Sequence, residues 1–137
     1  MTTRMLVDSN ILLRILTGEP ALQAQAAKQL FVRAAAGEVI LDVTPIVVAE
    51  TWYTLRSYYE VGRQEAAEKL QWLLKLPGVK VRDRADIFDA LGRLLSASVG
   101  FADAYLAAIA AGETVSVASF DRDFDKFRDV KRVEPKI

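Results

Sequence analysis

Short apolar runs alternate along the chain with longer segments that mix apolar and polar residues. The runs are typical of buried strands, and the mixed segments have the spacing of helices. Strands are predicted at residues 5–7, 39–41, 79–81, 114–118 and 130–133. Helices are predicted at residues 11–16, 21–36, 44–59, 63–75, 85–98 and 102–111, with a polar loop of one or two helical turns at 119–127. This alternation favours an α/β fold, a three-layer α/β/α sandwich around a mostly parallel sheet of about five strands.

Glycine and proline divide these elements where helices are expected to begin or end. Pro45 suits the first turn of a helix, and Gly37 and Gly112 suit the position just after a helix. The pattern runs through the whole chain without a repeat or a linker. A chain of 137 residues is also the usual length of one domain. We therefore expect a single domain over residues 1–137.

Composition narrows the chemistry. The chain contains neither cysteine nor histidine, so a metal ion would have to be held by oxygen ligands, which suits magnesium, manganese or calcium. Lys and Arg together number 18, as do Asp and Glu, so the formal net charge is zero. Proteins that hold nucleic acid by general electrostatic attraction are usually basic, so a nucleic-acid substrate would need a local patch or a metal.

The apolar run near the N-terminus is interrupted by Asp8 and is too short for a signal sequence or a membrane span. We expect a cytoplasmic protein that does not engage a membrane.

Three acidic residues stand alone in apolar or small-residue runs. They are Asp8, Glu50 and Asp103. An unpaired carboxylate buried in such a run costs several kcal/mol or becomes protonated. A shared divalent cation would offset several carboxylates at once. These acids are therefore candidate metal ligands.

The predicted elements offer a way to bring the acids together. Asp8 follows the first strand, and Asp121 follows the strand predicted at 114–118. In open α/β sheets, ligands bind beyond the carboxyl ends of the strands. Asp103 in the first turn of its helix and Glu50 on a helix after a strand can converge on the same place.

Three of the four acids also have an ordinary structural interpretation. Asp8 can cap the following helix, and Asp103 can stabilise the first turn of its own helix through the helix dipole. Asp121 lies in a charged segment, where acids are usually solvated. Only Glu50 has no local alternative.

Three polar residues near these acids are auxiliary candidates. Asn10 can share metal or water contacts with Asp8, or cap the helix. Ser119 can orient Asp121 or a phosphate, although turn formation is its commoner role. Arg14 lies one helical turn after Asn10 and can touch a substrate phosphate, or remain on the surface.

Four segments together resemble the motifs of PIN-domain ribonucleases. The opening motif is similar to Leu6-Val7-Asp8-Ser9-Asn10-Ile11-Leu12, and the second acidic motif to Val48-Ala49-Glu50. The third resembles Phe101-Ala102-Asp103-Ala104-Tyr105-Leu106-Ala107-Ala108, and the fourth resembles Ser119-Phe120-Asp121-Arg122-Asp123-Phe124, where the family often has threonine in place of Ser119. The motifs occur in order and cover essentially the whole chain. The compact length resembles the VapC-type toxins of toxin–antitoxin pairs.

This resemblance implies an acidic quartet of Asp8, Glu50, Asp103 and Asp121, with Asp123 as a fifth acid of lesser weight. Asp8 and Asp103 would bind the metal directly, and Glu50 and Asp121 directly or through water. It also implies an endoribonuclease that uses Mg²⁺ or Mn²⁺, a homodimer, and inhibition by a small antitoxin protein.

Two other functions fit parts of the sequence. An aspartate-nucleophile phosphatase would place Asp8 at the end of a strand, but the residues after Asp8 lack the second acid and the Gly-Thr of such enzymes. A non-catalytic PIN-like binding module would keep the fold, but it is disfavoured by the presence of all four acids. The aromatic residues Trp52, Tyr53, Tyr58, Tyr59 and Trp72 suit core packing first and a dimer interface second.

Overall fold

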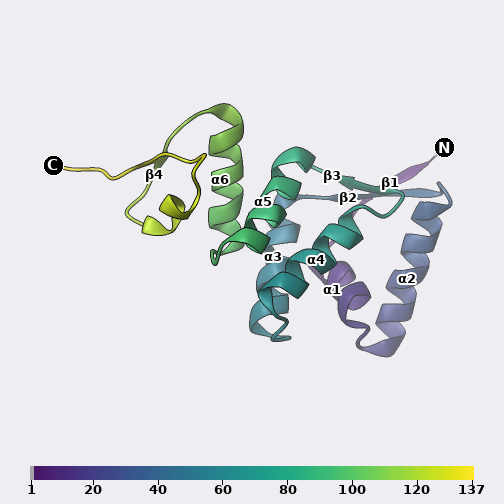
Figure 1. Ribbon diagram of the computed structural model, residues 1–137. Coiled ribbons are helices and arrows are strands. Elements are labelled where there is room, and N and C mark those ends of the chain that lie inside the picture. The colour runs from purple at the N-terminus through teal and green to yellow at the C-terminus, as the bar shows by residue number, and fades with distance from the viewer. Residues whose placement is uncertain (1) are drawn as a thin grey trace. The chain divides into compact units, whose positions relative to one another are not determined.

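The computed structural model describes residues 2–137, which form two compact units, an N-terminal unit ending at Asp83 and a C-terminal unit from Arg84 to Ile137. Throughout both, strands alternate with helices, and all strand pairs are parallel (Figure 1). The predicted α/β class with parallel strands is confirmed. Among residues 2–137, no helix combines the length and the apolar character needed to cross a bilayer.

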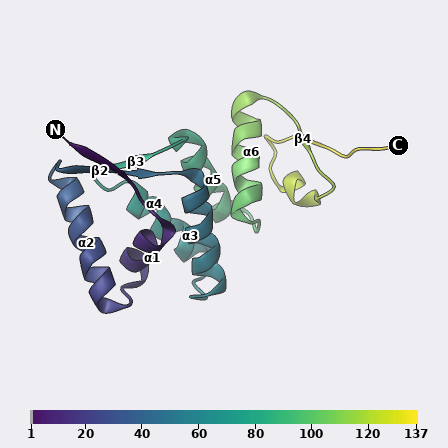
Figure 2. The ribbon, with the colours of Figure 1, turned by 180° about the vertical axis from the view of Figure 1, so that it is seen from behind.

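The N-terminal unit is built on a three-stranded sheet in the order β1-β2-β3. Figures 1 and 2 both show its helices gathered on one side of this sheet, as expected when successive right-handed crossovers run in one direction. The helix-facing residues Val39, Leu41 and Val43 of the central strand are fully buried. Its elements are β1 (Thr3–Leu6), α1 (Ser9–Thr17), α2 (Ala21–Ala35), β2 (Val39–Val43), α3 (Pro45–Ser57), α4 (Arg63–Leu74) and β3 (Val79–Val81).

A buried ion pair lies on the other side of the central strand. Asp42 is completely buried, and both of its oxygens accept hydrogen bonds from Arg82, at 3.0 and 3.1 Å. Arg4 approaches the same carboxylate to 3.7 Å. The Arg82 hydrogen bond outweighs burial, so the pKa of Asp42 is lowered from its ordinary value. This pair connects residues from all three strands and their ends.

One glycine permits a close approach in this unit. Gly78 precedes β3 with a φ of +83°, a left-handed conformation that favours glycine. A side chain there would collide with the backbone and Cβ of Ala34 in α2. The glycine between the predicted helix at 63–75 and the predicted strand at 79–81 is therefore also a packing requirement.

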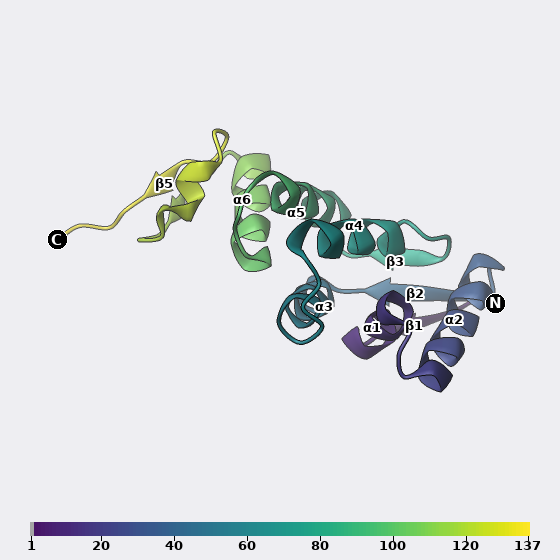
Figure 3. The same cartoon turned by 60° about the horizontal axis from the view of Figure 1, so that its bottom comes forward.

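The C-terminal unit contains two packed helices followed by a small two-stranded sheet. Small residues on α6 (Ala104, Ala107 and Ala108) are fully buried, and α5 and α6 contact each other extensively. Figure 3 shows β5 beside the 3-10 helix η1, and the two elements are in contact. The elements are α5 (Arg84–Ser96), α6 (Phe101–Glu113), β4 (Val117–Ala118), η1 (Arg122–Lys126) and β5 (Arg132–Val133).

Two details differ from the sequence prediction. The five strands lie in a sheet of three and a sheet of two, where one sheet of about five was expected. The fourth strand begins only at Val117. α6 continues through Gly112 to Glu113, and Thr114, with a φ of +55°, gives the left-handed cap expected of Gly112. The alanine-rich sequence favours this longer helix over the extra strand residues.

Candidate metal centre

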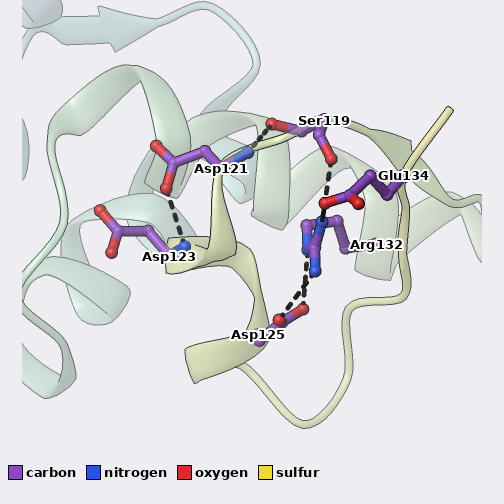
Figure 4. Close-up of polar contacts among 6 residues, drawn as sticks. All are labelled: Ser119, Asp121, Asp123, Asp125, Arg132 and Glu134. Atoms are coloured by element: carbon purple, nitrogen blue, oxygen red, sulfur yellow. Dashed lines mark hydrogen bonds and ion pairs between the residues drawn. The ribbon is translucent and has the colours of Figure 1, made fainter.

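Three acidic side chains of the C-terminal unit form a cluster. Carboxylate oxygens of Asp103, Asp121 and Asp123 lie within 4.8 Å of one another. Asp103 comes from the first turn of α6, while Asp121 and Asp123 come from the segment that begins η1. Figure 4 shows the carboxylates of Asp121 and Asp123 on the same side of their loop. The structure thus brings together two acids of the predicted quartet and the fifth acid of lesser weight.

The loop geometry explains why Asp121 and Asp123 take these positions. Asp121 is the N-cap of η1, and its Oδ1 accepts a hydrogen bond of 2.8 Å from the backbone N–H of Asp123. Ser119 Oγ accepts a hydrogen bond of 2.9 Å from the backbone N–H of Asp121. The predicted auxiliary residue Ser119 therefore orients the backbone that carries Asp121. This leaves the second oxygen of Asp121 available to a ligand.

The electrostatics of the cluster are unfavourable without a cation. Partial burial, and then the negative charges of Asp121 and Asp123, raise the pKa of Asp103 above its ordinary value. Lys126 lies 3.0 Å from Asp123 and offsets part of the charge. A divalent cation would offset the remainder and favour the ionised form of Asp103.

The donor set fits a hard cation. All three side chains offer carboxylate oxygens, the ligand type preferred by Mg²⁺ and Mn²⁺. Magnesium holds its ligands at roughly 2.0–2.1 Å, so opposite ligand atoms lie about 4 Å apart and adjacent ones about 3 Å apart. Oxygens already within 4.8 Å of one another need only small side-chain rotations to reach these separations.

Asp8 and Glu50 lie in the N-terminal unit. Asp8 caps α1, with its Oδ1 accepting a hydrogen bond of 2.7 Å from the backbone N–H of Ser9. Glu50 lies in α3, which packs against α1. Both side chains are exposed, so neither carboxylate carries the burial cost expected from its apolar run. The run around Glu50 does pack into the core, since Val48 and Trp52 are buried. The helical turn directs Glu50 outward although its neighbours in sequence are apolar.

The remaining candidates also lie in the N-terminal unit. Asn10 is exposed in the first turn of α1. Arg14 donates a hydrogen bond of 2.6 Å from Nε to Gln23 and lines a cavity of about 620 Å³. The walls of this cavity are largely apolar and include Phe31, Val32 and Trp72. The structure therefore associates Arg14 with an apolar surface.

The sequence alone placed too little weight on Asp123 and did not identify Arg132 at all. Asp123 entered only through the family resemblance, as a fifth acid of lesser weight, because by itself it is one acid in a charged run. Arg132 gave no signal, because nothing in the local sequence distinguishes it from the other basic residues of this charged C-terminal segment. Its guanidinium contacts Ser119, Asp125 and Glu134, as the close-up shows.

Comparisons with known proteins agree with the motifs. The PIN domain family profile matches residues 5–130. Among solved structures, the chain is similar to one described as VapBC2 from Rickettsia felis bound to a DNA fragment from their promoter, with 15% sequence identity, 96% of this chain and 98% of that chain covered, and a TM-score of 0.38. No curated protein matches the chain significantly. PIN domains are generally nucleases and typically use a divalent metal, and the profile covers nearly all of the sequence. By this match, the chain belongs to the PIN domain family.

Proposed function

We propose that this chain is an endoribonuclease that hydrolyses RNA phosphodiesters with Mg²⁺ or Mn²⁺ at its acidic cluster. The single observation that carries the proposal is the convergence of Asp103, Asp121 and Asp123. Membership of a family of nucleases supports it. The proposal retains Asp8 and Glu50 as further acids of the site, on the strength of their sequence motifs.

The roles of the residues follow from their contacts. Asp103 and the open oxygen of Asp121 are the proposed direct ligands within the C-terminal unit. Asp123 is paired with Lys126, so we assign it a weaker role, either binding the cation through a water molecule or serving as an additional ligand. When bound, a divalent ion held by these carboxylates would supply Lewis-acid chemistry to the scissile phosphate and to the attacking water.

Proton transfer in this site must use carboxylates or water. The chain has no histidine, so the usual imidazole base is absent. Glu50 or Asp121 is the proposed residue that orients the attacking water. Because the cluster supplies negative charge only, it would repel an RNA phosphate until a cation is present. Metal binding is therefore expected to precede RNA binding.

An RNA cleavage assay tests the proposal. The parent protein is incubated with structured and single-stranded RNA in Mg²⁺, with and without a chelator, beside Asp103→Asn. Glu113→Gln is a matched control, since Glu113 is an exposed acid at the other end of the same helix. Cleavage should require the metal, disappear in Asp103→Asn and persist in Glu113→Gln. Equal cleavage by the parent and Asp103→Asn would refute the assigned site.

We also propose that the chain is the toxin of a toxin–antitoxin module, acting as a homodimer. The resemblance to VapC-type toxins supports this. The apolar walls of the cavity in the N-terminal unit, with Trp72 56% exposed, favour a protein partner at that surface. Sedimentation of the purified chain tests the dimer, and a short reading frame for a DNA-binding protein beside the gene would support the antitoxin. A monomer at micromolar concentration would contradict the proposed homodimer.

A further inference from the structure

The guanidinium of Arg132 donates four hydrogen bonds to three residues. Arg132 lies in β5, and its side chain is only 13% exposed. Nε and Nη2 donate to the two carboxylate oxygens of Asp125, at 3.0 and 3.2 Å. Nη1 donates to the backbone carbonyl of Ser119 at 3.1 Å and to Glu134 at 3.0 Å.

These contacts join the two ends of one segment. Ser119 follows β4, and Asp125 lies in η1, so a single guanidinium holds residues 119 and 125 (Figure 4). Asp121 and Asp123 lie between these two residues. Arg132 does not itself touch either carboxylate; its influence passes through Ser119, whose hydroxyl also accepts from the Asp121 backbone.

Such an anchor is needed because the acids repel one another. Asp121 and Asp123 are held with their oxygens within 4.8 Å of Asp103. Without a cation, this repulsion favours movement of the exposed segment away from α6. The bidentate pair with Asp125 gives the geometry that an anchor requires, since a planar guanidinium fixes the orientation as well as the distance.

We propose that Arg132 is a positioning residue that holds segment 119–125 so that Asp121 and Asp123 stay beside Asp103, ready to bind a divalent cation. This inference rests on the proposed metal-dependent function. Arg132 does not contact the metal ligands, so its effect appears in the affinity for the cation. Residues of this kind, which orient ligands without binding the metal, typically change affinity by roughly 10–100-fold.

The test is calorimetric Mn²⁺ binding to the full chain, which is independent of RNA cleavage. Arg132→Met removes the guanidinium but keeps an apolar stem, and should weaken Mn²⁺ binding about tenfold or more. Arg132→Lys keeps the charge but cannot bridge all three partners, so its affinity should fall between those of Arg132→Met and the parent. Asp125→Asn releases one end of the segment with the arginine still present, and should weaken binding several-fold. It keeps the test decisive if Arg132→Met does not fold.

A second arginine provides the matched control. Arg93 in α5 is 10% exposed and forms a similar bidentate pair with Asp129, at 2.8 and 2.6 Å, and its hydrogen-bond partners, Asp89 and Asp129, lie outside segment 119–125. Arg93→Met should therefore bind Mn²⁺ like the parent, even where thermal unfolding in EDTA shows reduced stability. Equal losses of affinity in Arg93→Met and Arg132→Met would overturn the inference, because they would indicate general loosening of the unit.

Asp103→Asn separates this inference from the proposed function. If Asp103→Asn binds Mn²⁺ as tightly as the parent, the proposed metal centre itself is wrong. If Asp103→Asn loses binding but Arg132→Met and Asp125→Asn keep the parental affinity, the metal centre stands and the positioning role of Arg132 is refuted.

Discussion

Replacing Asp103 by asparagine is expected to stabilise the metal-free protein at neutral pH. The change removes one negative charge from a cluster whose oxygens lie within 4.8 Å of one another, and it keeps the shape of the side chain. At that separation, one pair of charges repels by about 1 kcal/mol in water and about 3 kcal/mol at an effective dielectric constant of 20. Because Asp103 is only partly buried, screening by solvent favours the lower part of this range.

The pH dependence gives the prediction its sign. The pKa of Asp103 is raised above the ordinary value of 3.8, chiefly by burial and then by Asp121 and Asp123. In the window above 3.8, the native state therefore holds more protons than the unfolded state, so the parent loses stability as pH rises through the raised pKa. Asparagine does not titrate. The extra stability of Asp103→Asn over the parent should be full at neutral pH. It should vanish below pH 3.8, where Asp103 of the parent is protonated in both the native and the unfolded state.

The assay is thermal unfolding in EDTA across pH, followed by a repeat with Mg²⁺. A gain of about 1 kcal/mol should raise the melting temperature by roughly 2–6 °C. With added Mg²⁺, the parent should melt at a higher temperature than Asp103→Asn, because Mg²⁺ stabilises only a native state that binds it. Asp86→Asn is the control, since Asp86 is also a first-turn acid and reports the loss of about 0.3–1 kcal/mol of helix-dipole stabilisation alone. A destabilised Asp103→Asn with the same deficit at neutral and acidic pH would refute the repulsion argument.

Three further predictions concern the fold. Gly78→Ala should reduce the free energy of unfolding by about 2 kcal/mol or more, because it combines a left-handed φ with a collision against α2; the helical Gly92→Ala, with open space around it, should instead gain about 0.5–1 kcal/mol in the same urea titration. Ala107→Leu should overfill the contact between α5 and α6 and cost about 1–3 kcal/mol, also measured by urea unfolding. Asp42→Asn should lower the melting temperature at neutral pH. Since the pKa of Asp42 is lowered, this deficit should shrink as pH falls through the range of that carboxyl; a constant deficit would contradict the ion-pair explanation.

The order of the elements could be predicted from the sequence because each has a local cause. Apolar β-branched runs mark β2 and β3, and the break at residues 76–78 separates α4 from β3 as expected. Strand length was harder to predict. The Thr114–Ala118 run has strand composition, but only Val117 and Ala118 are extended, because the alanine-rich helix before them continues further.

The candidate site depended on contacts that local sequence does not encode. Asp103 was identified by its isolation and its motif, and Asp121 by its place after a predicted strand and its motif; the structure places the two together. Isolation in sequence did not indicate burial, since the completely buried acid is Asp42, whose partner Arg82 lies 40 positions away. Arg132 was missed because the sequence does not show that its guanidinium joins Asp125 to the backbone of Ser119. Long-range ion pairs become visible only when the strands that carry them are placed in register.

The position of the two tryptophans has a practical consequence for studying this chain. Both lie in the N-terminal unit, Trp52 in the core at 4% exposed and Trp72 on the wall of the apolar cavity at 56% exposed. Their emission maxima should therefore differ, with the buried Trp52 emitting at a shorter wavelength than the exposed Trp72. Tryptophan fluorescence would follow the unfolding of residues 1–83 alone, whereas circular dichroism would follow all six α-helices. A difference between the two melting curves would show that the two units unfold separately.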